Sequence, residues 1–215
     1  MVEKKRIPTS LYAEMTPNPA AMKFVADRAL ISGGLQVEYR SKAEASGSSP
    51  LAEELFNFPF VQSVFISGNY VTVLKDESLG WEMIVQQLRE YIREWLMDNE
   101  IVVSAVTAEL LHRTQETPSD PVQALHSSPT DYSQFEPTEF DDEIRFLLHE
   151  YVRPAVEMDG GAIDFKAYKD KKVYVQLKGS CSGCPSSTQT LKGGIENLLK
   201  AKLPDVVEEV VAEAV

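Results

Sequence analysis

Apolar and polar side chains alternate along several segments of the first half of the chain, which predicts a small sheet. Leu35–Arg40 alternates with a period of two, and Val61–Ser67 and Tyr70–Lys75 are apolar, β-branched runs on either side of Gly68-Asn69. A two-residue Gly-Asn connection between two such runs is typical of a β-hairpin. This part of the chain therefore predicts three strands, the last two paired as a hairpin.

The remaining patterns of the first half predict helices, a loop and one ambiguous segment. Apolar residues between Trp81 and Leu96 recur at i, i+3, i+4 and i+7, which predicts an amphipathic helix. Leu51–Phe58 predicts a short helix opened by Pro50, and the polar run Ser41–Pro50 predicts a loop. Met22–Val25 is compatible with either a strand or a helix, because so short an apolar run fits both.

The end of the chain predicts a second small α+β unit. An apolar helical stripe runs from Phe140 to Val152, with Thr138 as its expected N-cap and its end expected before Pro154. Met158–Gly161 is expected to form a tight turn. Ile163–Ala167 and Val173–Leu177 then alternate with period two and predict a strand hairpin.

A helix and a strand complete this second unit. Leu191, Ile195, Leu198 and Leu199 form the apolar stripe of a helix over Pro185–Lys202, and Val206–Val211 is expected to add a last strand. The order is α-β-β-α-β, which can place one layer of helices on a small sheet.

The periodic pattern fades between the two units. Residues 104–137 contain Pro118, Pro121, Pro129 and Pro137 among Ser, Thr, Asp and Gln, and only Ala105–Arg113 suggests a helical turn or two. The predicted fold class is α+β, with two small α+β domains joined by a flexible linker. The expected boundaries are an N-terminal domain over 1–103, a linker over 104–137 and a C-terminal domain over 138–215.

Charge and hydropathy argue against a nucleic-acid-binding, membrane-spanning or secreted protein. The formal net charge is −12, and both halves of the chain are acidic, so a nucleic-acid-binding face is not expected. No apolar run approaches the roughly 20 residues that span a bilayer, and no hydrophobic stretch follows the basic Lys4–Arg6, so neither a membrane span nor a secretory signal is expected. The expected location is the cytoplasm, with a mature organellar form as the alternative.

The two cysteines, Cys181 and Cys184, are the candidate functional residues. They lie in Gly179–Ser186, between the second strand of the C-terminal hairpin and the helix that Pro185 opens. Unpaired backbone N–H groups at a helix start stabilise thiolates and sulfide, and glycines let the backbone approach a bulky ligand. A close pair of this kind in a reducing compartment indicates metal binding or redox chemistry.

A single Cys-x-x-Cys provides two sulfurs, whereas zinc sites and common iron–sulfur clusters need four ligands. The three histidines, at positions 112, 126 and 149, have no spacing that pairs them with the cysteines. Two identical loops meeting across a two-fold axis would supply four thiolates, so a homodimer-bridged site is the simplest solution. A dithiol–disulfide oxidoreductase, a zinc-clamped interaction module and two ordinary buried cysteines are the alternatives.

The C-terminal unit contains a characteristic set of short motifs, namely Val152–Ala155, Met158–Gly161, Gly179–Ser187, Thr190–Lys192 and Gly194–Glu196. Through these motifs it closely resembles the C-terminal domain of the NifU/Nfu iron–sulfur scaffold family. The first half is similar to the N-terminal domain of Nfu-type proteins through Thr16–Pro19, Met22–Phe24, Ser49–Ala52 and Val64-Phe65. This second likeness makes Met22–Val25 a strand.

The resemblance implies a carrier rather than a turnover enzyme. It implies a [4Fe–4S] cluster bridged between two chains by Cys181 and Cys184 of each, with a [2Fe–2S] form also conceivable. It further implies delivery of the cluster to apo iron–sulfur recipient proteins, after supply by upstream assembly proteins. The resemblance assigns no settled chemistry to the first domain, and we expect that domain to select recipients or assembly partners. Asp159-Gly160-Gly161 is interpreted as a structural turn.

Overall fold

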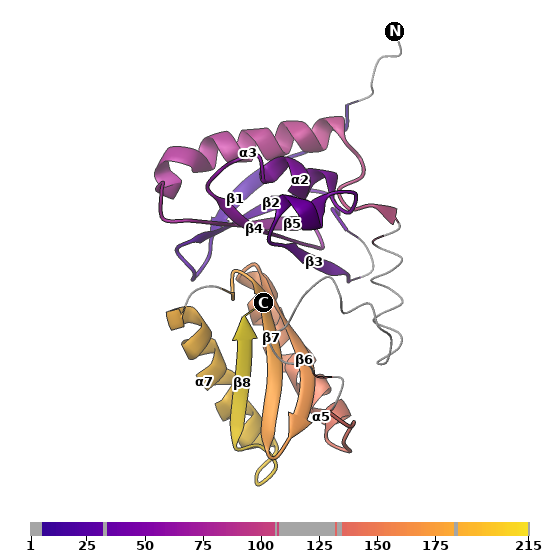
Figure 1. The fold of residues 1–215 in the computed structure, drawn as a ribbon, viewed down its shortest axis with the longest axis vertical. Helices are drawn as coiled ribbons and strands as arrows, with labels where there is room; N and C mark the ends of the chain where they lie inside the picture. The colour runs from indigo at the N-terminus through magenta and orange to yellow at the C-terminus, as the bar shows by residue number, and fades with distance from the viewer. Residues whose placement is uncertain are drawn as a thin grey trace. The chain divides into compact units, whose positions relative to one another are not determined.

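The computed structural model describes residues 6–31, 34–105, 107, 132, 135–182 and 185–214. The chain divides into two compact units, Met1–Leu125 and His126–Val215. Each unit combines a sheet with helices (Figure 1), so the predicted α+β class with two units is confirmed. Among the described residues no helix is both long enough and apolar enough to cross a membrane.

The first unit is built on a five-stranded antiparallel sheet. Its strands lie in the order β1-β2-β5-β4-β3. They are β1 (Leu11–Met15), β2 (Ala21–Ala26), β3 (Gln36–Tyr39), β4 (Val61–Ser67) and β5 (Tyr70–Lys75). The ambiguous segment is thus a strand, and β4 and β5 pair through the expected turn, in which Gly68 has φ +50°.

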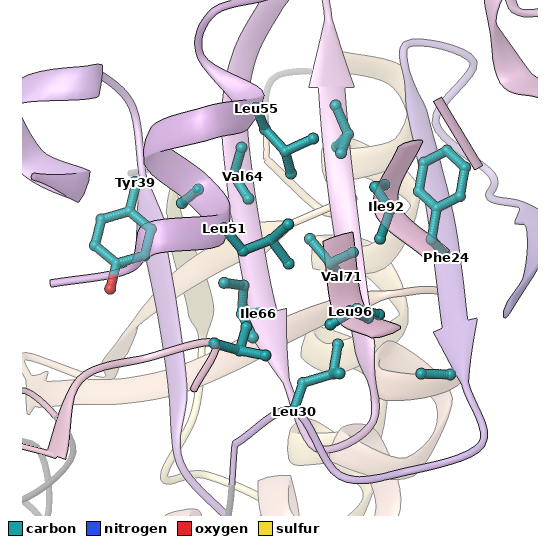
Figure 2. Packing of buried hydrophobic residues seen from close by; sticks show 14 of the residues in the cluster. Phe24, Leu30, Tyr39, Leu51, Leu55, Val64, Ile66, Val71, Ile92 and Leu96 are labelled. Atoms are coloured by element: carbon teal, nitrogen blue, oxygen red, sulfur yellow. The ribbon is translucent and has the colours of Figure 1, made fainter. Parts of the chain in front are cut away.

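Helices cover one face of this sheet and bury its apolar side chains. α2 (Pro50–Leu55) contributes Leu51 and Leu55, and α3 (Trp81–Asp98) contributes a stripe that includes Ile92 and Leu96. Figure 2 shows these side chains against Phe24, Val64, Ile66 and Val71 of the strands. All of them are nearly inaccessible to solvent, and burying each such side chain stabilises the fold by about 1.5–3 kcal/mol.

Two features of the first unit differ from the sequence-based expectation. β1, which the sequence pattern did not predict, pairs with β2. The segment Ser41–Pro50, expected to be a loop, contains α1 (Lys42–Ala45) and the first residue of α2. The cause is local capping, because the Ser41 hydroxyl accepts a bond from Glu44 N while the Glu44 carboxylate accepts one from Arg40 N.

The second unit has the predicted α-β-β-α-β order. A helical segment is followed by β6 (Gly161–Lys169), β7 (Lys172–Gly179), α7 (Pro185–Lys202) and β8 (Glu209–Ala214). β7 pairs antiparallel with β6 and parallel with β8, and α7 is the crossover that a parallel pair requires. β6 and β7 join through Asp170 and Lys171, both at positive φ, as in a type I′ turn.

The last strand begins three residues later than predicted. The apolar run from Val206 was interpreted as strand, but Val206 N and Val207 N both bond to Leu203 O, closing a turn after α7. Asp205 has φ +67° in this turn. Val206 and Val207 are therefore used to reverse the chain, and pairing with β7 starts at Glu209.

The predicted end of the first C-terminal helix was wrong. The segment continues through α5 (Asp141–Leu147), a π-helical turn η3 (Leu148–Val152) and α6 (Arg153–Met158), so Pro154 lies inside it. Proline lacks an N–H and clashes with the preceding turn of a regular α-helix. The wider π turn directly before Pro154 relieves both problems, and the proline then sits in the first turn of α6.

Thr138 does not cap this helix as expected. Its hydroxyl donates to the Asp141 carboxylate (2.6 Å), and the N-cap position is Phe140, which makes no side-chain capping bond. The helix therefore begins at Asp141, with Asp141, Asp142 and Glu143 favourably placed near its positive end.

Residues at the end of the first unit and at the start of the second each contact the core structure of their own unit. Ser104 N donates to Ser48 O (2.8 Å), and the Thr107 hydroxyl donates to that of Ser48 (3.0 Å). The rings of Tyr132 and Phe135 lie against Tyr174 of β7. Most of the helical turn predicted for Ala105–Arg113 lies outside the described residues.

We predict that Ser49→Ala destabilises the first unit much more than Ser41→Ala. Ser49 is buried, accepts from Ala52 N (3.2 Å) and donates to Val102 O (2.7 Å), so the change removes a cap and leaves a buried carbonyl without this donor. The expected losses in unfolding free energy are about 2–3 kcal/mol for Ser49→Ala and below about 1 kcal/mol for Ser41→Ala. Denaturant titration of both variants measures the difference, and equal losses would contradict it.

Candidate cluster-binding site

Cys181 lies in the turn that leaves β7. Gly179 is the last residue of β7, and Pro185 is the first of α7, so the expected position between a strand end and a helix start is confirmed at both flanks. Cys184, the second expected ligand, lies outside the described residues together with Gly183.

Hydrogen bonds fix the described part of this turn. The Gly179 carbonyl accepts from both Ser182 N (3.1 Å) and the Ser182 hydroxyl (2.8 Å), and Gly179 itself has φ +63°. The Thr188 hydroxyl, in α7, donates to Cys181 O (3.2 Å). The turn is thus tied to β7 behind it and to the helix ahead of it.

A second turn, Asp159–Gly161, packs against the cysteine turn. The Ser180 hydroxyl donates to Asp159 O (2.6 Å), and Ser180 N donates to Gly160 O (3.3 Å). Gly161 and Gly179 face each other at the end of the β6–β7 ladder. The two glycine motifs, 18 positions apart at Gly161 and Gly179, therefore form one local structure.

The Cys181 thiol lies directly over Gly161. Cys181 is 7% exposed and belongs to the core cluster of its unit. A Cβ on Gly161 would lie 2.6 Å from Cys181 Sγ and 2.8 Å from Lys178 O, which is closer than real Cβ atoms approach any neighbour. Only glycine at position 161 leaves the thiol where it is.

Gly161 is a site residue that the sequence interpretation missed. Asp159-Gly160-Gly161 was explained by turn dihedrals, which is correct for Gly160, at φ +81°. Gly161 instead begins β6, and its small size accommodates sulfur. The repeated glycine itself was the available signal, because only Gly160 has a positive φ in this turn and the dihedrals do not require glycine at position 161.

An ion pair neutralises Lys178, the lysine on β7 that precedes the turn. Lys178 Nζ lies 2.7 Å from the Asp164 carboxylate. Burial alone would raise the pKa of Asp164, but the positive charges of Lys178 and Lys166 outweigh it and hold that pKa below its ordinary value. Burial in turn lowers the pKa of Lys166. The charge of Lys178 is therefore compensated within its own ion pair.

Within the described parts of the chain, no three His, Cys, Asp or Glu side chains gather as a metal-binding group. His149 is exposed on η3, and His112 and His126 lie outside the described residues. Of the two predicted ligands, the structure thus places Cys181 in a constrained turn and leaves Cys184 a prediction.

Comparison with known proteins decides the family. Residues 11–99 match the family described as "Scaffold protein Nfu/NifU N terminal", and residues 144–211 match the "NifU-like domain". The chain is 33% identical over 202 residues to the human protein named "NFU1 iron-sulfur cluster scaffold homolog, mitochondrial", covering 91% of this chain and 69% of that protein.

The chain belongs to the Nfu/NifU iron–sulfur cluster scaffold family.

A protein of the same name from Drosophila willistoni is 34% identical over 205 residues, which is 93% of this chain. The chain spans 63% of the length of that relative. The NifU-like match covers the whole segment from η3 through α7, so both turns of the candidate site lie inside it. The family resemblance stated from the sequence is confirmed in both units.

We predict that Gly161→Ala disturbs the site of this Nfu-family protein, whereas Gly193→Ala does not. The added methyl group at position 161 must displace the thiol or the backbone. At Gly193, inside α7, nothing lies within 4 Å of an added Cβ, and alanine favours helix by about 1 kcal/mol. We expect Gly161→Ala to lower unfolding free energy by about 1–3 kcal/mol, a typical cost of overpacking.

Thermal unfolding and the rate of Cys181 alkylation in a Cys184→Ser background measure these two effects. Gly161→Ala is expected to accelerate alkylation because the thiol is pushed out of its packed position. Unchanged stability and alkylation in that variant would show that the thiol does not need the space above Gly161.

Proposed function

We propose that this protein carries a [4Fe–4S] cluster between two copies of itself, bound by Cys181 and Cys184 of each copy, and transfers it to apo iron–sulfur proteins. Membership of the scaffold family supports the class of cargo. The observation that carries the proposal is the constrained turn of Cys181, with glycine beneath the thiol and a helix start beyond it. Such a turn suits a ligand that must be held in one position.

The number of sulfurs supports the two-copy arrangement. The sequence contains two cysteines, and a [4Fe–4S] cluster takes four thiolates. If a two-fold axis passes through the cluster, the cysteine turns of the two copies together supply all four thiolates. A [2Fe–2S] cluster needs the same four thiolates and is the alternative cargo.

A carrier role follows from how little of each chain would hold the cluster. Two bonds to each copy make release possible when a recipient offers its own thiolates in exchange. We therefore infer that the protein receives clusters from upstream assembly proteins and is not a turnover enzyme. Cluster binding needs both cysteines in the reduced thiolate form, so the proposed role requires a reducing compartment, such as the cytoplasm that the sequence favours.

The burial of Cys181 bears on both the cluster proposal and the dithiol oxidoreductase alternative. In the oxidoreductase chemistry an exposed, low-pKa thiol attacks the substrate disulfide. The Cys181 side chain is instead buried in the core cluster, where its thiol packs against Gly161. A bridged cluster likewise requires this thiol to face the second copy, so the burial applies to both chemistries. Membership of the scaffold family is what favours the cluster.

We propose the domain limits 1–103, 104–137 and 138–215, with the cluster held by the last. The first domain would select recipients or assembly partners. Its sheet and helices form a complete core, so the isolated domain is expected to be available for partner contact without cluster.

We predict that anaerobic reconstitution with iron and sulfide gives a loaded dimer containing about two irons and two sulfides per chain, as one four-iron cluster per four thiolates requires. Cys181→Ser and Cys184→Ser should each abolish loading, since each removes two of the four thiolates from the dimer. His149→Ala, which changes an exposed potential ligand outside the turn, is the matched control and should load normally.

Absorption spectra, iron and sulfide analysis and sedimentation velocity read out these results. A fully loaded protein that sediments as a monomer without an added thiol would refute the bridged site. Zinc in place of iron, with no acid-labile sulfide in protein purified without oxygen, would instead identify a zinc-clamped module.

A further inference from the structure

The last part of the first C-terminal helix carries an exposed apolar stripe. Tyr151, Pro154, Ala155 and Met158 are spaced i, i+3, i+4 and i+7 and are all exposed, Tyr151 to 50% and Met158 to 75%. Val152 and Val156 supply the buried side of the same helix. A helix on a protein surface ordinarily turns polar residues outward, so these four residues, the α6 stripe, need a reason to be apolar.

The α6 stripe ends at the cysteine turn. Met158 directly precedes Asp159, whose carbonyl binds the Ser180 hydroxyl, and Gly161, three residues after Met158, lies under the Cys181 thiol. From Met158 the stripe extends back along the helix by about 10 Å, given a rise of 1.5 Å per residue. It therefore borders the site on the side of the Asp159–Gly161 turn.

We propose that the α6 stripe is the protein part of the interface between the two copies that share the cluster. This inference rests on the proposed function, because it takes the bridged cluster as given. Two Cys181 turns that bind one cluster must approach each other closely, so the surface bordering each turn faces the other copy. A two-fold interface is self-complementary, and an apolar stripe meeting its own copy satisfies that condition.

Some of the charges around the stripe are paired or lie against it. The chain has a net charge of −12, which repels a second copy. Beside the stripe, Arg153 and Glu157 neutralise each other at 2.7 Å, and Lys202 Nζ lies 4.8 Å from the centre of the Tyr151 ring. The exposed Glu150 and Asp159 leave the surroundings of the stripe mildly acidic, so apolar contact and the shared cluster, not charge, have to favour the approach of two copies along α6.

The stripe is too small to hold two copies together without the cluster. Four side chains expose roughly a few hundred Å² per copy, below the ~800 Å² that each partner of a stable complex buries. The stripe alone should leave the metal-free protein monomeric. With the cluster bridging the thiolates, the stripe adds its contact energy and fixes the orientation of the two copies.

The test compares Met158→Gln with Met83→Gln in the full chain. Both methionines are highly exposed on helices, but Met83 lies on α3 of the other unit. Ala155→Arg is a stronger second variant, and thermal unfolding identifies any variant that fails to fold. Each protein is reconstituted anaerobically with iron and sulfide, and the dimer dissociation constant is measured by sedimentation over a dilution series.

We expect Met158→Gln to raise this constant several-fold and Ala155→Arg by about tenfold or more, the range of interface side chains that matter. Met83→Gln should match the unchanged protein, and iron and sulfide per chain at high concentration should stay the same. Unchanged dissociation in folded Met158→Gln and Ala155→Arg would overturn the role of the stripe and leave the bridged cluster standing. Unchanged dissociation combined with slower cluster transfer to a purified apo [4Fe–4S] protein would also overturn this role, because it would show that the stripe contacts recipient proteins instead of the second copy.

A loaded but monomeric unchanged protein would overturn the bridged cluster and the stripe together. Loss of iron and sulfide in Met158→Gln at concentrations where the control is dimeric would also count against the stripe, because it would mean that Met158 acts on the ligand turn of its own chain.

Discussion

The close packing of the Cys181 thiol on Gly161 is the contact on which the site depends. It is produced by two turns, one after α6 and one after β7, that bond to each other through Ser180. Neither turn alone holds the sulfur, because each leaves backbone groups that the other satisfies. The position of the cysteine is therefore a property of the whole hairpin-plus-helix unit, and the core residues beneath it contribute to the site by fixing both turns.

Much of this arrangement was predictable from the sequence because the relevant signals are local. Period-two alternation identified β6 and β7, and the stripe around Ile195 and Leu199 identified α7 with its observed limits. The cysteine turn was placed correctly between β7 and α7. In the first unit, Gly68-Asn69 was enough to predict the β4–β5 turn, and the apolar stripe was enough to predict α3. Each of these signals specifies its element without help from distant residues.

The failures arose where distant or cooperative interactions decide the structure. Pro154 normally ends a helix, and the π turn that accommodates it leaves no mark in the apolar pattern. Val206 and Val207 have strand propensity but serve a turn closed by Leu203 O. The role of Gly161 needs the distance between β6 and the following cysteine turn, which no linear motif contains. Cys184 stays a sequence prediction, because it lies outside the described residues.

The parallel pairing of β7 with β8 sets the order in which this unit can be completed. β8 begins 25 positions after Cys184, on the far side of the α7 crossover, and it pairs with β7 along Lys172–Leu177, up to two residues before Gly179. Parallel pairing across such a separation forms late, because a long chain segment must first be ordered. The turn that follows β7 consequently gains its neighbouring strand only after the chain beyond α7 has folded back, so this end of the unit is completed late in folding.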